Sequence, residues 1–224
     1  MSDLICYGFR DAISGFFEFP TDNARRILPS HLEPVELHHG SSVFSMTAFD
    51  FTDSPVGPYA EVVLSVVVAP LIKAGARVPK SAVYPYLVAT TTREAREHAI
   101  DRWHLPHWME DVAVEFSRGE RQLSVRVSAG SADVAEMTVA EFAWQSVRHL
   151  YQAFMQDGAN AYLAHVTMEG AHSEHEEELG RLRLFAHPFH RELAIGEVEG
   201  VPFRETWMRE GVQSFEPLAQ LEIA

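Results

Sequence analysis

Glu61 stands out because it is an ionisable residue within an otherwise apolar segment. It lies near the start of YAEVVLSVVVAP, which spans residues 59–70. The β-branched composition of this segment predicts a central strand that is covered on both faces. An ionised carboxylate is costly in such surroundings, so we expect Glu61 to be paired, neutral or engaged in acid-base chemistry. The alternative is that Glu61 lies at the strand end, in contact with water.

A second segment that could carry chemistry joins a short strand directly to a short helix. It is PYLVATTTREAREHAIDRWHLP, residues 85–106. Residues 86–89 favour a strand, and the capping-box spacing of Thr91 and Glu94 predicts that a helix begins near Thr92. Apolar residues at helical spacing predict one buried stripe, made of Ala95, Ala99 and Trp103. Such a junction can aim a side chain into an interior site.

The twelve histidines of the chain raise the question of a metal site. Three His-x-x-His pairs have a spacing found among metal ligands. They are His104 with His107, His172 with His175, and His187 with His190. No HExxH motif accompanies them, and Cys6 is the single cysteine, which excludes a multi-cysteine site. We therefore expect no metal, and a metal-dependent enzyme is the last of the functional alternatives.

Short segments that alternate between apolar and polar residues recur along the chain, as is typical of strands. Strands are expected at residues 16–19, 42–51, 59–70, 86–89, 112–116, 122–129, 134–142 and 181–185, and near Glu197 and Val212. Residues 144–156 fit either a helix or, through the Asp157-Gly158 turn, a hairpin with the next segment, and we favour the hairpin. A short helix is expected at residues 23–28.

Strands outnumber helices in this pattern, and no regular crossover helices separate them. The expected fold class is therefore α+β and mainly antiparallel β, with the sheet curled into a closed barrel or a sandwich and a few peripheral helices. No linker divides the chain, so we expect a single domain over residues 1–224. Residues 73–80, which contain both lysines, and the acidic, His-containing residues 171–180 are expected to be exposed loops.

The composition narrows the classes of function. Hydrophobic residues make up 46% and charged residues 22%, as in ordinary soluble proteins. The formal net charge of -14 and the absence of a Lys/Arg cluster argue against a nucleic-acid partner. The N-terminal residues lack the pattern of a signal peptide, and no apolar run reaches about eighteen residues, so we expect a cytoplasmic protein without membrane association. No GxSxG, P-loop or GxGxxG motif indicates a hydrolase or a nucleotide cofactor, and we expect no cofactor.

The order and spacing of several motifs resemble the acetoacetate decarboxylase family. The motifs are FPTDNARRILPSHLEPVEL, GPYAE, the Arg93-Glu94 pair and ELGRLRLFAHPFHRELA. The resemblance covers most of the chain and implies a closed, cone-like antiparallel β structure with peripheral helices, assembled into homo-oligomers. It also implies a helix lysine that forms a Schiff base with a β-keto acid, next to a second lysine that lowers its pKa.

The resemblance assigns candidate roles to individual residues. Arg10 matches a pocket arginine, which could clamp a carboxylate, and Glu61 matches a pocket glutamate. A second family glutamate should fall at Ser45 or Met46, and neither is acidic. The lysine pair should fall near Ile100 and Asp101, where there is no lysine.

Two further residues on the expected helix are pocket candidates. His98 is the histidine that the resemblance places nearest the site, and Asp101 could act as an acid or base in place of the missing amine. The alternative to a pocket role is an ordinary surface position. Asp101 would then belong to a charged, solvated helix face, and Arg10 would form a surface ion pair.

These observations lead to three functional hypotheses. The first is an enzyme, lyase-like, that binds a small oxo- or carboxylated metabolite in the β cone and uses Glu61 as an acid or base and Arg10 as an anion clamp. The second is a non-catalytic protein that binds small molecules on the same fold. The third is the metal-dependent enzyme. The first two rest on the expectation that neither Lys73 nor Lys80 reaches the cavity.

Overall fold

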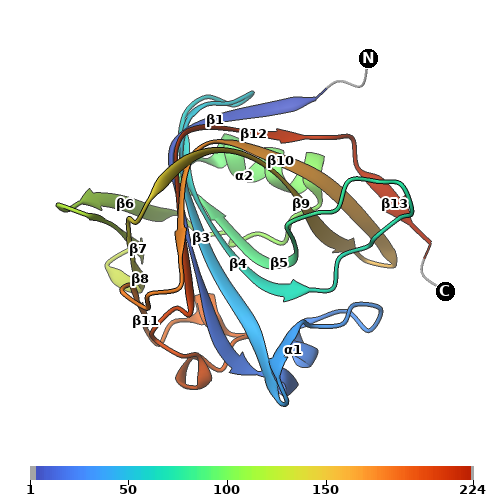
Figure 1. Cartoon of the computed structure of the whole chain (residues 1–224), viewed down its shortest axis with the longest axis horizontal. Helices are drawn as coiled ribbons and strands as arrows, with labels where there is room; N and C mark the ends of the chain where they lie inside the picture. Colours follow the sequence, from blue (N-terminus) through green and yellow to red (C-terminus); the bar gives the residue numbers. More distant parts are fainter. Residues whose placement is uncertain (1–3, 223–224) are drawn as a thin grey trace.

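Seven strands form the main body of the protein, for which a computed structural model describes residues 4–222. They are β1 (Ile5–Pro20), β3 (Ser41–Asp53), β4 (Tyr59–Val68), β5 (Ser81–Thr90), β9 (Trp144–Asp157), β10 (Asn160–His175) and β12 (Arg204–Phe215). They pair in the order β1, β12, β10, β9, β5, β4 and β3, and the pairing of β3 with β1 closes the ring into a barrel (Figure 1). Only β5 and β9 pair in parallel among these neighbours, so the expected closed, mainly antiparallel fold is confirmed.

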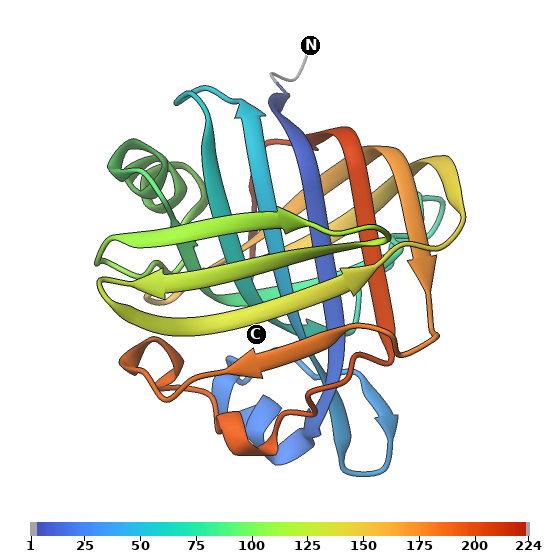
Figure 2. The same ribbon diagram turned by 90° about the vertical axis from the view of Figure 1, so that its left-hand side faces the viewer.

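A second, antiparallel sheet covers one side of the barrel. Its strands are β6 (Val112–Arg118), β7 (Gln122–Ala129), β8 (Ala132–Ala140) and β11 (Arg181–Leu184), in the order β11, β8, β7 and β6. Figure 2 shows these strands running across the strands of the barrel. Two short strands, β2 (Glu36–His38) and β13 (Ala219–Leu221), pair with β3 and β10 respectively.

The helices are few and lie at the ends of strands. They are α1 (Thr21–Ile27), α2 (Arg93–Trp103) and the 3-10 turns η1 (Pro188–His190) and η2 (Ile195–Glu197). Helix α2 begins as expected, because the Thr92 side chain accepts a hydrogen bond from the Ala95 N–H at 3.2 Å. It ends at His104, whose φ of 52° is the left-handed conformation common after helices. No helix among residues 4–222 is long and apolar enough to cross a membrane.

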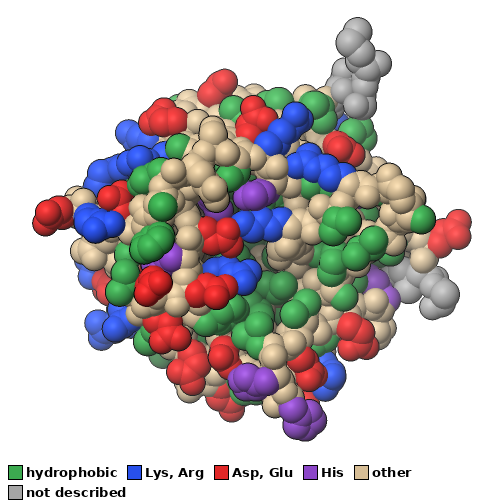
Figure 3. Space-filling view, in the orientation of Figure 1, with side chains coloured by type: hydrophobic (Ala, Val, Ile, Leu, Met, Phe, Trp, Pro, Cys, Tyr) green, Lys and Arg blue, Asp and Glu red, His purple; other side chains and the backbone are tan. Residues whose placement is uncertain are grey.

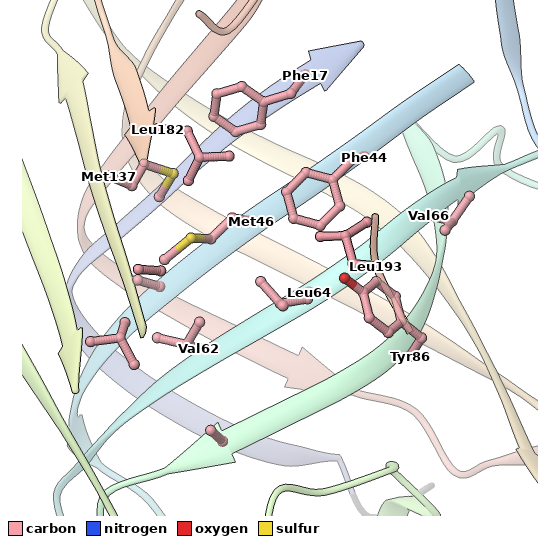
Figure 4. Close-up of a cluster of buried hydrophobic side chains, with 14 of the residues drawn as sticks. Phe17, Phe44, Met46, Val62, Leu64, Val66, Tyr86, Met137, Leu182 and Leu193 are labelled. Atoms are coloured by element: carbon pink, nitrogen blue, oxygen red, sulfur yellow. The ribbon is translucent and has the colours of Figure 1, made fainter. Parts of the chain in front are cut away.

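Alternation along the strands separates the cavity wall from the packed core. On β3, Ser45 and Thr47 face the barrel interior, while Phe44 and Met46 face outward and are fully buried. The outward side chains of the barrel join those of the second sheet in one apolar cluster (Figure 4). This cluster is where burial of apolar surface stabilises the fold.

Three expectations about individual segments are wrong. Residues near Glu197 form η2 and not a strand. Strand β1 begins at Ile5, well before residue 16. Residues 171–175, expected in a loop, complete β10 and pair with β12. The hairpin favoured for residues 144–156 is confirmed, because β9 and β10 pair from Asn160 opposite Asp157 onward.

Candidate functional site

The barrel encloses a cavity of about 210 Å³. Most of its wall is apolar, with side chains such as Val63, Val83 and Met155, and a smaller number of polar groups converge on it. Small-molecule sites in proteins usually combine an apolar wall with a few placed polar groups. The cavity is therefore the candidate functional site, and its ionisable side chains decide what chemistry is available.

Glu61 faces this cavity from β4, where its neighbours on the same face of the strand are Val63 and Ser65. Its residue surface is 9% exposed. Burial raises the pKa of Glu61 to about 8, and the Tyr59 hydroxyl beside it acts in the opposite direction. The carboxyl can therefore hold a proton near neutral pH and release it slightly above, as a general acid or base must.

Aromatic side chains and helix α2 close the region around Glu61. The Trp103 indole N–H donates to the Tyr7 hydroxyl at 2.7 Å, and that hydroxyl lies 2.6 Å from Nε2 of His98. Because Tyr7 accepts from Trp103, its own proton is available to the imidazole. Burial lowers the pKa of His98, which favours this neutral, accepting form. The network joins α2 to β1 beside the cavity.

Lys80 also lines the cavity, which contradicts the expectation that no lysine reaches it. Its side chain is 26% exposed and forms an ion pair with Glu174 of β10. The Lys80 Nζ lies 3.4 Å from Nε2 of His149. Arg204 at the start of β12 adds a second positive charge to the wall, 3.9 Å from Glu174. Residue 80 immediately precedes β5, so the strand carries this side chain to the barrel wall.

Histidines accompany this charged group. His172 faces the cavity from β10 and packs edge-on against His149, with ring centroids 5.3 Å apart. Burial, and then the charge of Lys80, lower the pKa of His172 to about 4, so it is a neutral imidazole. Burial would raise the pKa of Glu174, but its hydrogen bond and charge interaction with Lys80 lower it. Figure 3 shows acidic, basic and histidine side chains side by side near the middle of the face viewed in Figure 1.

The structure brings one of the four expected site residues, Glu61, to the cavity wall. Arg10 does not line it, because its side chain is 60% exposed and its guanidinium pairs with Asp50 at 2.5 Å. His98 lies behind Tyr7, and Asp101 is exposed on α2. Arg10 points away from the cavity because the register between β1 and β3 is irregular around Phe9 and Asp11. This irregularity turns the Arg10 side chain away from the inward face that carries Ala12 and Ser14.

The His-x-x-His pairs do not assemble a metal centre. Among residues 4–222, no group of three or more His, Cys, Asp or Glu side chains is arranged to hold a metal ion. His175 and His190 instead lie 3.0 Å from the backbone carbonyls of Ala140 and Val134. These histidines therefore have structural partners in the second sheet.

Comparison with known proteins identifies the type of fold. No protein-family model matches the chain, and no curated protein matches its sequence. An acetoacetate decarboxylase-like enzyme from Sphingomonas wittichii RW1 matches its structure with a TM-score of 0.65 and 11% identity, over 99% of this chain and 94% of that one. The acetoacetate decarboxylase from Legionella pneumophila matches with a TM-score of 0.64 and 14% identity, over 96% of this chain and 87% of that one. The enduracididine biosynthesis enzyme MppR, complexed with pyruvate, matches with a TM-score of 0.63 and 12% identity, over 99% of this chain and 91% of that one.

The protein therefore has the acetoacetate decarboxylase-like fold over nearly its whole length. The resemblance seen in the sequence motifs is confirmed at the level of the fold. At these identities the likeness defines the architecture, and function has to be argued from the site itself.

Proposed function

We propose that the barrel cavity binds a small oxo- or carboxylated metabolite and that the protein is a lyase-type or related enzyme in which Glu61 is the acid or base. The observation that carries this proposal is a buried carboxyl on a largely apolar wall, with its pKa raised to about 8. The same fold in MppR is known in complex with pyruvate, a small oxo acid. The cavity volume of about 210 Å³ suits a metabolite of that class.

The charged side chains of the cavity supply the anion-binding function that was expected of Arg10. Lys80 and Arg204 line the wall and share Glu174 as a partner. Lys80 precedes β5, and Glu61 pairs with Thr90 at the other end of that strand, so the cations lie at the opposite end of the cavity from Glu61. They would give charge-assisted hydrogen bonds to a carboxylate that is remote from the group on which Glu61 acts. Because Lys80 does reach the cavity, the proposal depends on its pairing with Glu174 and no longer on the absence of an amine. Lys80 serves here as a cation rather than as a nucleophile, because carbonyl condensation requires a free amine and this one is bound to a carboxylate.

The test is a thermal-shift screen of keto acids and hydroxy acids, followed by NMR detection of turnover for each compound that stabilises the protein. Glu61→Gln is expected to fold, to lose ligand-induced stabilisation and to reduce turnover by at least roughly a hundredfold, since it removes the acid-base group. If Glu61 is the base, kcat/KM should rise as pH passes about 8. Glu120→Gln, at an exposed hairpin turn, is the matched control.

The same screen separates the alternatives. Saturable binding without turnover of any bound compound would support the second candidate, a non-catalytic binding protein, which the masking of the Lys80 amine by Glu174 favours. Borohydride treatment with each ligand, followed by mass measurement, tests the mechanism. A covalent adduct at Lys80 would contradict acid-base chemistry at Glu61, and an unchanged ligand response in Glu61→Gln would contradict the site.

A further inference from the structure

The barrel cavity has different chemistry at its two ends, and the distance between them restricts what can reach both. Glu61 pairs with Thr90 at the end of β5, and Lys80 lies ten residues before Thr90, where that strand begins. At about 3.3 Å per residue and a strand tilt of about 40°, these positions are on the order of 25 Å apart along the barrel axis. The long side chains at both positions shorten this interval to roughly 10–15 Å between the carboxyl and the ammonium group.

This gap sets the length of a ligand that contacts both ends. A hydrogen bond takes up about 2.8 Å at each end, so the ligand itself has to extend over roughly 7 Å. An extended chain advances by about 1.2 Å per bond, and such a ligand therefore needs about six bonds between its two polar ends. A molecule of the size of pyruvate reaches only one end at a time.

A row of neighbouring residues leads across the barrel wall from the strand of Glu61 to the cations. Ser65 follows Glu61 on β4 and lies opposite Ser45 of β3. Ser45 lies opposite Phe16 of β1, whose partner on β12 is Arg204. All of these side chains line the cavity. The hydroxyl of a serine is bonded to Cβ, so the hydroxyls of Ser65 and Ser45 face the cavity as their Cβ atoms do.

A second row runs beside the first and ends at the partner of Lys80. Thr47 lies opposite Ser14, Ser14 lies opposite Thr206, and Thr206 lies opposite Glu174. The hydroxyls of Ser14 and Thr47 are 2.9 Å apart and bond to each other. All four side chains line the cavity. We call the hydroxyl-bearing residues of both rows the hydroxyl strip, and they are Ser14, Ser45, Thr47, Ser65 and Thr206.

The wall across the barrel from the hydroxyl strip is apolar between the two ends of the cavity. It is contributed by β5, β9 and β10, which lie across the barrel from β1 and β3 (Figure 1). Its side chains include Val83, Pro85, Met155, Val166 and Met168. A chain that lies in this cavity therefore has one polar edge and one apolar edge to match.

Length and polarity together define a class of ligand. We infer that the barrel takes an elongated oxo acid, with its carboxylate at Lys80 and Arg204, an oxo group about six bonds away at Glu61, and a further oxygen on the chain between them that faces the hydroxyl strip. This inference rests on the proposed function, because it assigns the ends of the ligand to Glu61 and to the two cations.

Isothermal titration of the full chain with oxo acids of increasing length tests the distance. Pyruvate, 4-oxopentanoate and 7-oxooctanoate separate the carboxylate from the oxo group by increasing numbers of bonds. We expect 7-oxooctanoate to bind at least about tenfold more tightly than the two shorter acids. Lys80→Met should weaken this binding by about tenfold or more and should leave the binding of the uncharged methyl 7-oxooctanoate unchanged.

A second titration tests the hydroxyl strip. The acid 4,7-dioxooctanoate adds one oxygen in the middle of the same chain and should bind more tightly than 7-oxooctanoate. The double change Ser45→Ala and Ser65→Ala should remove this advantage, because it removes the hydroxyls that contact the added oxygen. The binding of 7-oxooctanoate should not change. Ser117→Ala, at an exposed position of β6 outside the cavity, is the matched control.

These titrations measure binding, so they separate the ligand class from the proposed catalysis. No binding of 7-oxooctanoate, equal binding of pyruvate, or binding that survives Lys80→Met would overturn the inference, as would an advantage of the dioxo acid that survives the loss of both serines. Turnover of a short oxo acid that depends on Glu61 would then leave the proposed function standing. The expected binding without any turnover would support the ligand class and contradict catalysis by Glu61.

Discussion

Glu61→Gln is expected to make the protein more stable at alkaline pH while removing the proposed acid-base group. In the folded protein the pKa of Glu61 is raised from 4.5 to about 8 by burial. Between these values the folded state retains a proton that the unfolded chain has lost, so the free energy of unfolding falls as pH rises. Above pH about 8 the folded wild-type protein carries the full cost of an ionised, buried carboxylate at position 61, and a glutamine side chain has no such cost.

The expected gain is on the order of 5 kcal/mol, since the pKa rises from 4.5 to about 8 and each pKa unit corresponds to about 1.4 kcal/mol. This is a large fraction of the stability of an ordinary domain. Urea unfolding of the wild type and of Glu61→Gln from about pH 5 to about pH 9 measures the difference in their free energies of unfolding. This difference should vanish near and below the pKa of Glu61 in the unfolded chain. Parallel pH profiles for the wild type and Glu61→Gln would contradict the raised pKa, and Glu120→Gln should run parallel to the wild type.

Glu205→Leu is expected to give the largest loss of stability among the changes considered. The Glu205 side chain is fully buried on β12, where its carboxylate accepts hydrogen bonds from Ala140 N at 2.8 Å and Gly180 N at 2.7 Å. These two bonds join the barrel to β8 and to the segment before β11. Leucine would leave both backbone donors buried without an acceptor.

Each orphaned donor costs about 1–3 kcal/mol, so the free energy of unfolding should fall by roughly 2–6 kcal/mol. Urea unfolding at neutral pH measures the change. Glu205→Gln keeps one acceptor oxygen and should lose less than Glu205→Leu. Equal stability of all three proteins would show that these hydrogen bonds do not hold the second sheet to the barrel.

The architecture was predictable from the sequence because most strands keep a clean alternation. Residues 122–129, for example, place Leu123, Val125 and Val127 in the core with polar residues between them. The unusual position of Glu61, which lies on the cavity wall, was predictable for the opposite reason, since its carboxyl interrupts an apolar strand. The start of helix α2 near Thr92 was predictable from the threonines before it, although the cap is Thr92 and not Thr91 of the expected capping box.

The charged part of the cavity was not predictable by the same reasoning. Within residues 171–175 of β10, the side chains that face the cavity are His172 and Glu174, and they make the barrel interior polar there. A strand that lines a polar cavity has no apolar face in that region, and its sequence is then indistinguishable from a loop. Lys80 was missed because it immediately precedes β5, and a strand start displaced by a few residues moves such a side chain from solvent to the cavity wall.

The position of Arg10 shows the limit of carrying a residue over by spacing. Its even-numbered place on β1 would put it on the inward face with Ala12 and Ser14. The irregular register around Phe9 and Asp11 changes the direction of its side chain, and Asp50 then pairs with it outside the cavity. Spacing along the sequence does not reveal such an irregularity.

A carboxyl-carbon NMR titration measures the pKa of Glu61 in the folded protein, with the Glu61 resonance assigned by its disappearance in Glu61→Gln. We expect an apparent pKa of about 8 in the free protein and a displaced pKa when a keto or hydroxy acid identified by thermal shift fills the barrel. An ordinary carboxyl pKa near 4.5, unaffected by any such ligand, would contradict this expectation.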